Sequence, residues 1–376
     1  MSTPAETPFA LVDRAKVERN IARLRAHLDG LGVALRPHVK TTKALEPTGM
    51  VFDGGTGPIT VSTLAEAEFF ADAGYTDILY AVGIAPGKLE RVARLRRRGI
   101  DLTVLLDTVE QAQAVASCAA ELGESLPALI EVDADGHRGG VRPDDPRLLE
   151  IARCLADGGA EVRGVMTHAG ESYAAIGRTA QEAAAEGERR ATVEAAQRLR
   201  AEGHPSPVVS VGSTPTAHAA RDLTGVSEVR AGVFVFFDLV MAGNGACEID
   251  DIALSVVATV IGRGPEDTSL LTDAGWMATS SDRGTACQPV DQYLGIVTTD
   301  RGQVIPDLVM VGASQEHGVL AVRPGVDRAL PDLPVGTRVR ILPIHACATA
   351  SQHDHYEVMA SEGEPVTERW VRARGW

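Results

Sequence analysis

A lysine stands at the end of an apolar run near the start of the chain. The segment Arg36-Pro37-His38-Val39-Lys40-Thr41 closes this run, and Lys40 brings a primary amine to its end. A lysine in such a place is most often a solvated charge. At the inner rim of a barrel, near Arg138, desolvation and a second positive charge would lower its pKa and favour the free amine. A free amine can form a Schiff base with an aldehyde, so Lys40 is the first candidate catalytic residue.

Further polar residues stand just after later apolar runs, at places equivalent to that of Lys40. They are Arg138, His168, Tyr173, the turn Gly212-Ser213-Thr214 and Arg230. The turn offers backbone N–H groups, hydroxyls and a helix start, which suit a phosphate, although such turns are common on their own. An aldehyde-reactive lysine and a phosphate site on one rim together indicate pyridoxal phosphate as cofactor.

His345 and Cys347 form a second candidate site. We expect them at the end of a strand, where a spacing of two residues directs both side chains to one face, close enough to share a cation. Imidazole and thiolate ligands suit zinc best, with manganese or magnesium as alternatives. Two protein ligands would leave positions open for substrate and water, as in catalytic sites. The alternative for Cys347 alone is a small buried hydrophobe.

The apolar pattern supplies a scaffold that would bring the first set together. Asp13 caps a helix that ends at Gly30, and eight strand candidates then alternate with helical stretches. The strand candidates are Val33–Val39, Pro58–Ser62, Thr76–Ala81, Asp101–Leu106, Pro127–Val132, Glu161–Thr167, Pro207–Val211 and Val226–Val235. This alternation predicts an α/β fold of the (β/α)8 TIM-barrel type, in which the active site lies at the carboxyl ends of the strands.

Past Asp250 the pattern changes to short strand candidates separated by Gly, Pro and Asp. We therefore expect a C-terminal β domain over residues 245–376 that carries the metal site. The pyridoxal-phosphate barrel would occupy residues 13–244. Residues 1–12 would add an N-terminal strand to the β domain.

Charge and composition narrow the range of partners. The chain has 36 Lys+Arg against 51 Asp+Glu, a formal charge of −15, with no compensating basic stripe. This balance argues against nucleic acid or an anionic membrane as partner. No apolar run is long enough for a membrane helix, and Met1–Ala10 lacks the features of a secretory signal. Five scattered cysteines indicate a reducing cytoplasm.

Five segments resemble one known family in its own order. They are Arg36–Thr41, Thr167–Tyr173, Asp273–Gly275, Ser314–Gly318 and Pro343–Cys347. On these segments the chain resembles the fold-type III pyridoxal-phosphate enzymes of the D-threonine aldolase/D-serine dehydratase group. It departs from the family at Thr42, where a histidine is usual, and around Ala231, where proline and tyrosine are usual.

The resemblance implies a role for each candidate residue. Lys40 would carry the cofactor, Arg138 would lie near its phenolic oxygen and the substrate carboxylate, and His168 would pack near its ring. Either Tyr173 or Arg230 would face the pyridine nitrogen. The phosphate would be held by Gly212, Ser213, Thr214, Gly232 and Val233. The resemblance also implies a divalent metal at His345 and Cys347, and a homodimer.

The implied activity is the dehydration of a D-β-hydroxy amino acid, such as D-serine or D-threo-3-hydroxyaspartate, to a 2-oxo acid and ammonia. A Lewis acid would help the β-hydroxyl leave. The alternatives are a D-threonine aldolase, an amino-acid racemase using Tyr293 or Tyr356, a non-catalytic pyridoxal-phosphate-binding protein, and a barrel enzyme of other chemistry.

Overall fold

The computed structural model describes residues 6–376, which fold into two compact units. Residues 23–43, 48–232 and 373–376 form the barrel unit. Residues 6–22, 44–47 and 233–372 form the β unit. Two helices, α1 (Arg14–Gly30) and α2 (Leu45–Val51), contribute residues to both units.

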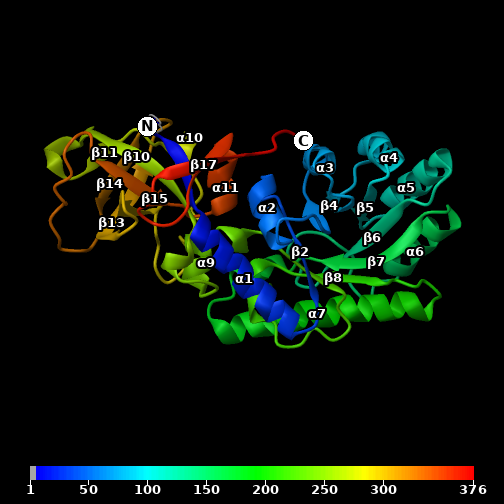
Figure 1. The fold of residues 1–376 in the computed structure, drawn as a ribbon. Coiled ribbons are helices and arrows are strands. Elements are labelled where there is room, and N and C mark those ends of the chain that lie inside the picture. The colour runs from blue at the N-terminus through cyan, green and yellow to red at the C-terminus, as the bar shows by residue number, and fades with distance from the viewer. Residues whose placement is uncertain (1–5) are drawn as a thin grey trace. The chain divides into compact units, whose positions relative to one another are not determined.

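Eight parallel strands form the sheet of the barrel unit, in the order β2-β9-β8-β7-β6-β5-β4-β3 (Figure 1). Their bounds are β2 Ala34–Pro37, β3 Ile59–Val61, β4 Asp77–Gly83, β5 Asp101–Leu106, β6 Pro127–Val132, β7 Glu161–Thr167, β8 Val208–Val211 and β9 Glu228–Ala231. The outer strands β2 and β3 meet through a bridge between His38 and Thr60, where Val39 N–H donates to Thr60 O over 2.9 Å. The predicted eight-stranded barrel is therefore confirmed, in a nearly closed form.

Helices follow most of these strands. They are α3 Leu64–Asp72, α4 Leu89–Arg97, α5 Val109–Leu122, α6 Arg147–Asp157, α7 Arg178–Ala201 and α8 Thr214–Ala219. Local signals explain their limits: Thr63 caps α3, and Thr108 and Gln111 form a capping box on α5 before Gly123 ends it at φ 66°. The longest helix, α7, runs alongside β7 and β8 (Figure 1).

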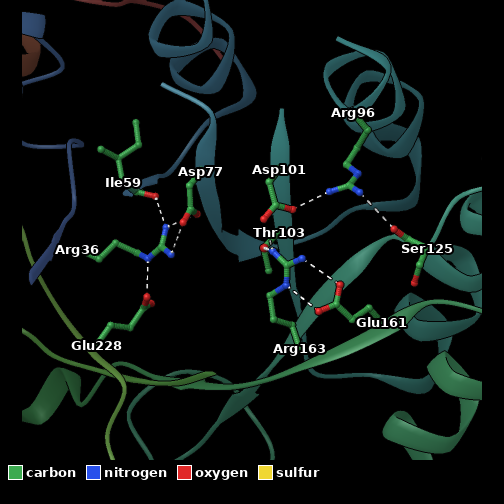
Figure 2. A network of polar contacts seen from close by, with 10 residues as sticks. All are labelled: Arg36, Ile59, Asp77, Arg96, Asp101, Thr103, Ser125, Glu161, Arg163 and Glu228. Atoms are coloured by element: carbon green, nitrogen blue, oxygen red, sulfur yellow. Dashed lines mark hydrogen bonds and ion pairs between the residues drawn. The ribbon is translucent and has the colours of Figure 1, made fainter. Parts of the chain in front are cut away.

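The barrel interior is layered. Leu79, Leu105, Leu129 and Met166 come from four neighbouring strands and form one apolar layer. Below it, at the amino ends of the strands, two arginines point inward among carboxylates, around a cavity of about 250 Å³ (Figure 2).

Each of these two arginines forms ion pairs with two carboxylates. Arg36 binds Glu228 at 2.7 Å and Asp77 at 2.9 Å, and Arg163 binds Asp101 at 2.8 Å and Glu161 at 2.9 Å (Figure 2). All four carboxylates belong to the first residue of a strand. The network thus stabilises the amino end of the barrel and leaves the carboxyl end for chemistry.

The β unit is built on one nine-stranded sheet, in the order β11-β14-β13-β12-β15-β10-β1-β16-β17. The strands are β1 Phe9–Asp13, β10 Leu254–Arg263, β11 Leu270–Thr272, β12 Ile296–Thr299, β13 Val304–Ala313, β14 Gly318–Val322, β15 Arg338–Leu342, β16 His355–Met359 and β17 Val366–Val371. The N-terminal strand β1 pairs antiparallel with β10 and parallel with β16. Alternate residues of β10, β13 and β15 supply most of the core of this unit.

Short helices complete the β unit: α9 Leu239–Asn244, α10 Trp276–Thr279 and α11 Ala346–Ser351. Strands β12 and β17 were not anticipated from the sequence. The expected strand Val226–Val235 was too long. It ends at Ala231 because the backbone turns after Gly232, where the N–H groups of Phe236 and Phe237 both bond to Val233 O. Among residues 6–376, no helix combines the length and apolar character needed to cross a membrane.

Candidate active site

Lys40 lies three residues beyond the end of β2, in a partly exposed turn. Its N–H faces His38 Nδ1 at 3.4 Å, and its ammonium makes no ion pair with any residue in the range 6–376. The neighbouring lysine differs. Lys43 Nζ lies 2.9 Å from the carboxylate of Glu66, which is almost completely buried. Lys43 is thus fixed by an ion pair, and Lys40 is the amine left available for chemistry.

His168 is the residue that follows β7. Its Nδ1 lies 3.3 Å from Gly212 O. Burial, and then the charge of Lys40, lower the pKa of His168 to about 3, with Arg230 and Arg138 adding to the effect. The ring is therefore neutral at physiological pH. The Tyr173 ring lies edge-on to it, with centroids 6.0 Å apart.

Arg230 is buried in the barrel at 3% exposure. Its guanidinium donates to Ser210 Oγ at 2.5 Å and to Thr167 O. Burial lowers its pKa to about 10, although nearby glutamates oppose the shift. Arg138, in contrast, is 63% exposed and lies 3.7 Å from Glu131. The structure thus brings together Lys40, His168, Tyr173 and Arg230 at one end of the barrel. Arg138 lies near enough for its charge to lower the pKa of His168.

The turn Gly212-Ser213-Thr214 joins β8 to α8. Ser213 caps α8 and forms a capping box with Thr216, so its hydroxyl bonds within the turn. Gly212 is required: its φ is 132°, and an added Cβ would lie 2.1 Å from Arg230 O. At Gly232, an added Cβ would lie 2.9 Å from His38 O. The next residue, Val233, is buried. It begins a short 3-10 helix, Val233–Val235, and is the residue at which the chain returns to the β unit.

These residues fit the expected cofactor. Lys40 provides an amine that forms no ion pair with the part of the chain that the structure describes, and three positive charges act on the adjacent His168. Gly212 and Gly232 allow the two turns to pack closely against the backbone of Arg230 and His38, which fixes the position of both turns. An aldehyde that carries a phosphate matches both the amine and the positive charge.

The expected position of His345 and Cys347 on a strand was wrong. His345 is the residue before helix α11, and Cys347 lies in its first turn. The helix forms because Asp238 Oδ2 accepts the Ala346 N–H at 2.9 Å and His345 O accepts the Thr349 N–H at 3.1 Å. The two side chains are nevertheless in contact, joined by a hydrogen bond.

An aspartate orients the histidine of this pair. Asp282 Oδ2 lies 2.9 Å from His345 Nδ1. Burial lowers the pKa of His345, but the hydrogen bonds that its ring forms with Asp282, which accepts, and with Cys347 outweigh this effect and raise the pKa to about 11. With Nδ1 held by a carboxylate, Nε2 is the nitrogen left to bind a metal, and a thiol stands beside it. The donor set therefore fits a divalent metal such as zinc. No group of three or more His, Cys, Asp or Glu side chains within residues 6–376 is placed to hold a metal ion.

Sequence reasoning missed three carboxylates in these two regions: Asp238, Asp282 and Glu188. Asp238 and Asp282 lie 108 and 63 positions from their partners in the chain. Glu188 lies within an alanine-rich helix and bonds to two turns. No local motif marks any of them, because each acts through a contact formed only on folding.

Comparison with known proteins identifies the family. Residues 12–240 match the family described as "Alanine racemase, N-terminal domain". Residues 253–359 match the family described as "Putative serine dehydratase domain". These two matches cover the barrel strands and most of the β unit.

Several characterised relatives align with nearly the whole chain. A D-threo-3-hydroxyaspartate dehydratase from Delftia sp. (strain HT23) is 52% identical over 99% of this chain and 98% of its own. A D-serine dehydratase from Dictyostelium discoideum is 30% identical over 96% and 95%. A D-threonine aldolase from Arthrobacter sp. is also 30% identical, over 99% and 93%.

The solved structure of the Delftia enzyme superimposes with a TM-score of 0.95, at 51% identity over 99% of this chain and 98% of that one. Two further structures are described as variants of a D-threo-3-hydroxyaspartate dehydratase: one carries alanine in place of a histidine, and the other carries alanine in place of the cysteine two positions later. The cysteine variant is described as a metal-free form. This chain therefore belongs to the fold-type III pyridoxal-phosphate-dependent lyases that join an alanine racemase N-terminal domain to a serine dehydratase domain.

Proposed function

We propose that this chain dehydrates a D-β-hydroxy amino acid, of the D-serine or D-threo-3-hydroxyaspartate type, to a 2-oxo acid and ammonia. The observation that carries the proposal is the contact between His345 and Cys347, with Asp282 on the histidine. A histidine and a cysteine at the same spacing were replaced by alanine in two D-threo-3-hydroxyaspartate dehydratase structures, one of which is metal-free.

The cofactor would be held by residues of the barrel and the turn that follows it. Lys40 would bind its aldehyde and Arg138 would lie near its phenolic oxygen and the substrate carboxylate. His168 would pack against the ring, and Arg230 or Tyr173 would face the ring nitrogen. Its phosphate would be held by Gly212, Ser213, Thr214, Gly232 and Val233. When bound, pyridoxal phosphate stabilises negative charge at the substrate Cα.

The metal would be held by His345 Nε2 and the Cys347 thiolate, with zinc as the ion that suits this donor pair best. A divalent ion there supplies a Lewis acid for the β-hydroxyl. Asp282 would hold the imidazole in the tautomer and orientation that binding requires.

The remaining chemistry falls to residues of the chain. The Lys40 amine would take the proton from Cα, on the one face where it stands. Loss of that proton and of the β-hydroxyl removes one water, and addition of water at Cα then releases ammonia and the 2-oxo acid. Burial and the charge of Lys40 lower the pKa of His168 to about 3 in the chain without cofactor, so this residue does not add a positive charge beside the amine before the cofactor binds.

The D-threonine aldolase is the alternative that a specific observation favours, because the Arthrobacter aldolase is 30% identical over 99% of this chain. In that reaction the β-hydroxyl loses its proton and the Cα–Cβ bond breaks. A racemase is less well supported. Tyr356 is fully buried, and Tyr293 lies between Arg283 and Arg323.

One assay separates these reactions. The purified protein is incubated with D-serine, D-threo-3-hydroxyaspartate or D-threonine, before and after treatment with a chelator. Ammonia with a 2-oxo acid is the expected product, and chelation should abolish it. Glycine with an aldehyde would establish the aldolase instead. Full turnover after metal removal would contradict the role given to His345 and Cys347.

Two further expectations belong to this proposal. The homodimer rests on the resemblance to fold-type III enzymes, and light scattering on the eluting protein would test it. A reducing cytoplasmic location fits the cysteines, since all five are free thiols.

A further inference from the structure

A carboxylate is buried where the barrel helix α7 should be apolar. The inward stripe of α7 is made of positions spaced three or four residues apart, and Glu188 occupies its middle at 2% exposure. Burial raises the pKa of Glu188, whereas the hydrogen bonds it accepts lower it. A carboxylate is unfavourable in such a place unless its oxygens are bonded, so its partners indicate its purpose.

The partners of Glu188 are the two turns that carry the candidate site. Its Oε1 accepts the N–H of Ala169 at 3.2 Å and the N–H of Gly212 at 3.0 Å. Ala169 is the residue after His168, and Gly212 opens the turn expected to hold the phosphate. One oxygen of one helix residue therefore joins the β7 turn to the β8 turn.

Hydroxyl groups continue this link. The side chain of Thr216 bonds to Glu188, and Thr216 Oγ1 lies 3.0 Å from Ser213 Oγ. Ser213 Oγ lies 2.8 Å from Ser172 Oγ. Glu188, Thr216, Ser213 and Ser172 are each exposed by 3% or less, so the network is buried and its geometry is restricted.

The Gly212 peptide passes this restraint to His168. Its N–H is held by Glu188, and its carbonyl oxygen faces His168 Nδ1 at 3.3 Å. A carbonyl can only accept, so Nδ1 must carry the proton. The ring is neutral, because burial holds the pKa of His168 at about 3, and Nε2 is therefore left as a bare acceptor.

We propose that Glu188 is a positioning residue, which clamps the β7 and β8 turns together and, through the Gly212 peptide, fixes His168 in its Nδ1–H tautomer. A bare Nε2 can accept a hydrogen bond but cannot donate one. The effect that we expect Glu188 to have on the affinity for pyridoxal phosphate rests on the proposed function. The tautomer itself does not, because the contacts that set it lie entirely within the chain.

The test uses three variants of the full-length protein. Glu188→Gln keeps an oxygen acceptor at the same reach, and the Thr216 hydroxyl can accept from the new amide. Glu188→Asp keeps the charge but shortens the side chain by one CH2, so it withdraws from the two N–H groups. Glu186→Gln changes an ion pair on the exposed face of the same helix and serves as the matched control.

The first measurement is the ¹⁵N spectrum of labelled histidine, with the His168 signal identified through His168→Gln. Without added cofactor, the unchanged protein, Glu186→Gln and Glu188→Gln should show a protonated Nδ1 and a bare Nε2. Glu188→Asp should show a mixture. An Nε2–H signal in the unchanged protein, or an unmixed Nδ1–H signal in Glu188→Asp, would overturn the proposal, and the first of these needs no variant to fold.

The second measurement is the titration of each protein with pyridoxal phosphate, followed by its visible absorbance. Glu188→Asp should bind about tenfold or more weakly, the effect expected when hydrogen bonds to a charged group are lost, while Glu188→Gln recovers most of the affinity. If Glu188→Gln binds pyridoxal phosphate as weakly as Glu188→Asp, the charge of Glu188 matters and the length of its side chain does not. That result would overturn the proposal that Glu188 clamps the two turns. Failure of the unchanged protein to bind the cofactor would refute the proposed function and leave the tautomer result standing.

Discussion

Asp282 Oδ2 lies 2.9 Å from His345 Nδ1, so the aspartate holds the histidine ring from the side opposite Nε2. A carboxylate on one ring nitrogen sets the tautomer and the direction of the other, and it raises the basicity of a ligating imidazole. The pair lies entirely within the β unit, beside Cys347. The aspartate therefore holds the His345 ring in this orientation before any metal binds.

We expect Asp282→Asn to lower metal affinity by about 10- to 100-fold, the usual effect of removing such a partner. The amide can still accept a hydrogen bond from Nδ1–H, but it carries no charge to support the imidazole. Metal content after dialysis against graded chelator concentrations measures the loss. The exposed Asp267→Asn is the control, and equal metal retention in both variants would refute the orienting role.

The two lysines after β2 give a matched pair of variants. Lys40→Ala should abolish the visible absorbance that appears when pyridoxal phosphate is added, because no amine remains to bind the aldehyde. Lys43→Ala should keep the absorbance but lower the free energy of unfolding by about 3 kcal/mol, because it leaves the buried carboxylate of Glu66 without its ion pair. Borohydride reduction and peptide mapping would locate the label. Its recovery on any residue other than Lys40 would contradict the assignment.

The barrel could be predicted from sequence because its strands are buried on both faces and read as continuous apolar runs. The place of Lys40 just beyond the first strand could be predicted for the same reason, since it stands where the first run ends; its catalytic role stays a prediction. His345 and Cys347 were paired correctly by residue type but for the wrong backbone reason, because the Asp238 contact that starts α11 joins residues far apart in sequence. Asp282 and Glu188 escaped prediction because each acts through contacts that only the folded chain creates.

Stability should fall in acid because of His168. The unfolded chain takes up a proton on this residue near pH 6.5, whereas the folded chain does so only near pH 3, so the contribution is complete above the unfolded value and is lost as pH falls. Between about pH 7.5 and about pH 5 the loss is about 2 kcal/mol. Urea unfolding without cofactor measures it.

His168→Gln should remove that part of the acid dependence, while Lys40, Arg230 and Arg138, whose charges act on His168, stay in place. His38, whose pKa is also lowered, mainly by burial, stays in place as well. His204→Gln, which changes a partly exposed histidine, is the control. If the free energy of unfolding of His168→Gln falls with pH as steeply as that of the unchanged protein, His168 titrates alike in the folded and unfolded chain.

The two arginines at the amino end of the barrel should differ in their contribution to stability. Arg163→Met leaves carboxylates that are 48% and 40% exposed, and Asp101 keeps its 2.8 Å contact with Arg96 (Figure 2). Water can solvate what remains, so we expect a loss of about 1 kcal/mol. Arg36→Met leaves Glu228, which is only 12% exposed, without its charge partner, and should cost about 3 to 5 kcal/mol.

Adding Glu228→Gln to Arg36→Met should recover part of that loss, because the variant then has no unpaired buried charge. Ser210 bonds to Glu228 at 2.6 Å and to Arg230 at 2.5 Å, so an effect of Arg36→Met on cofactor affinity can reach the site through these groups. Arg163 has no such link among its contacts and should leave the affinity unchanged. Equal unfolding free energies for Arg36→Met and Arg163→Met would show that burial of Glu228 does not set the difference.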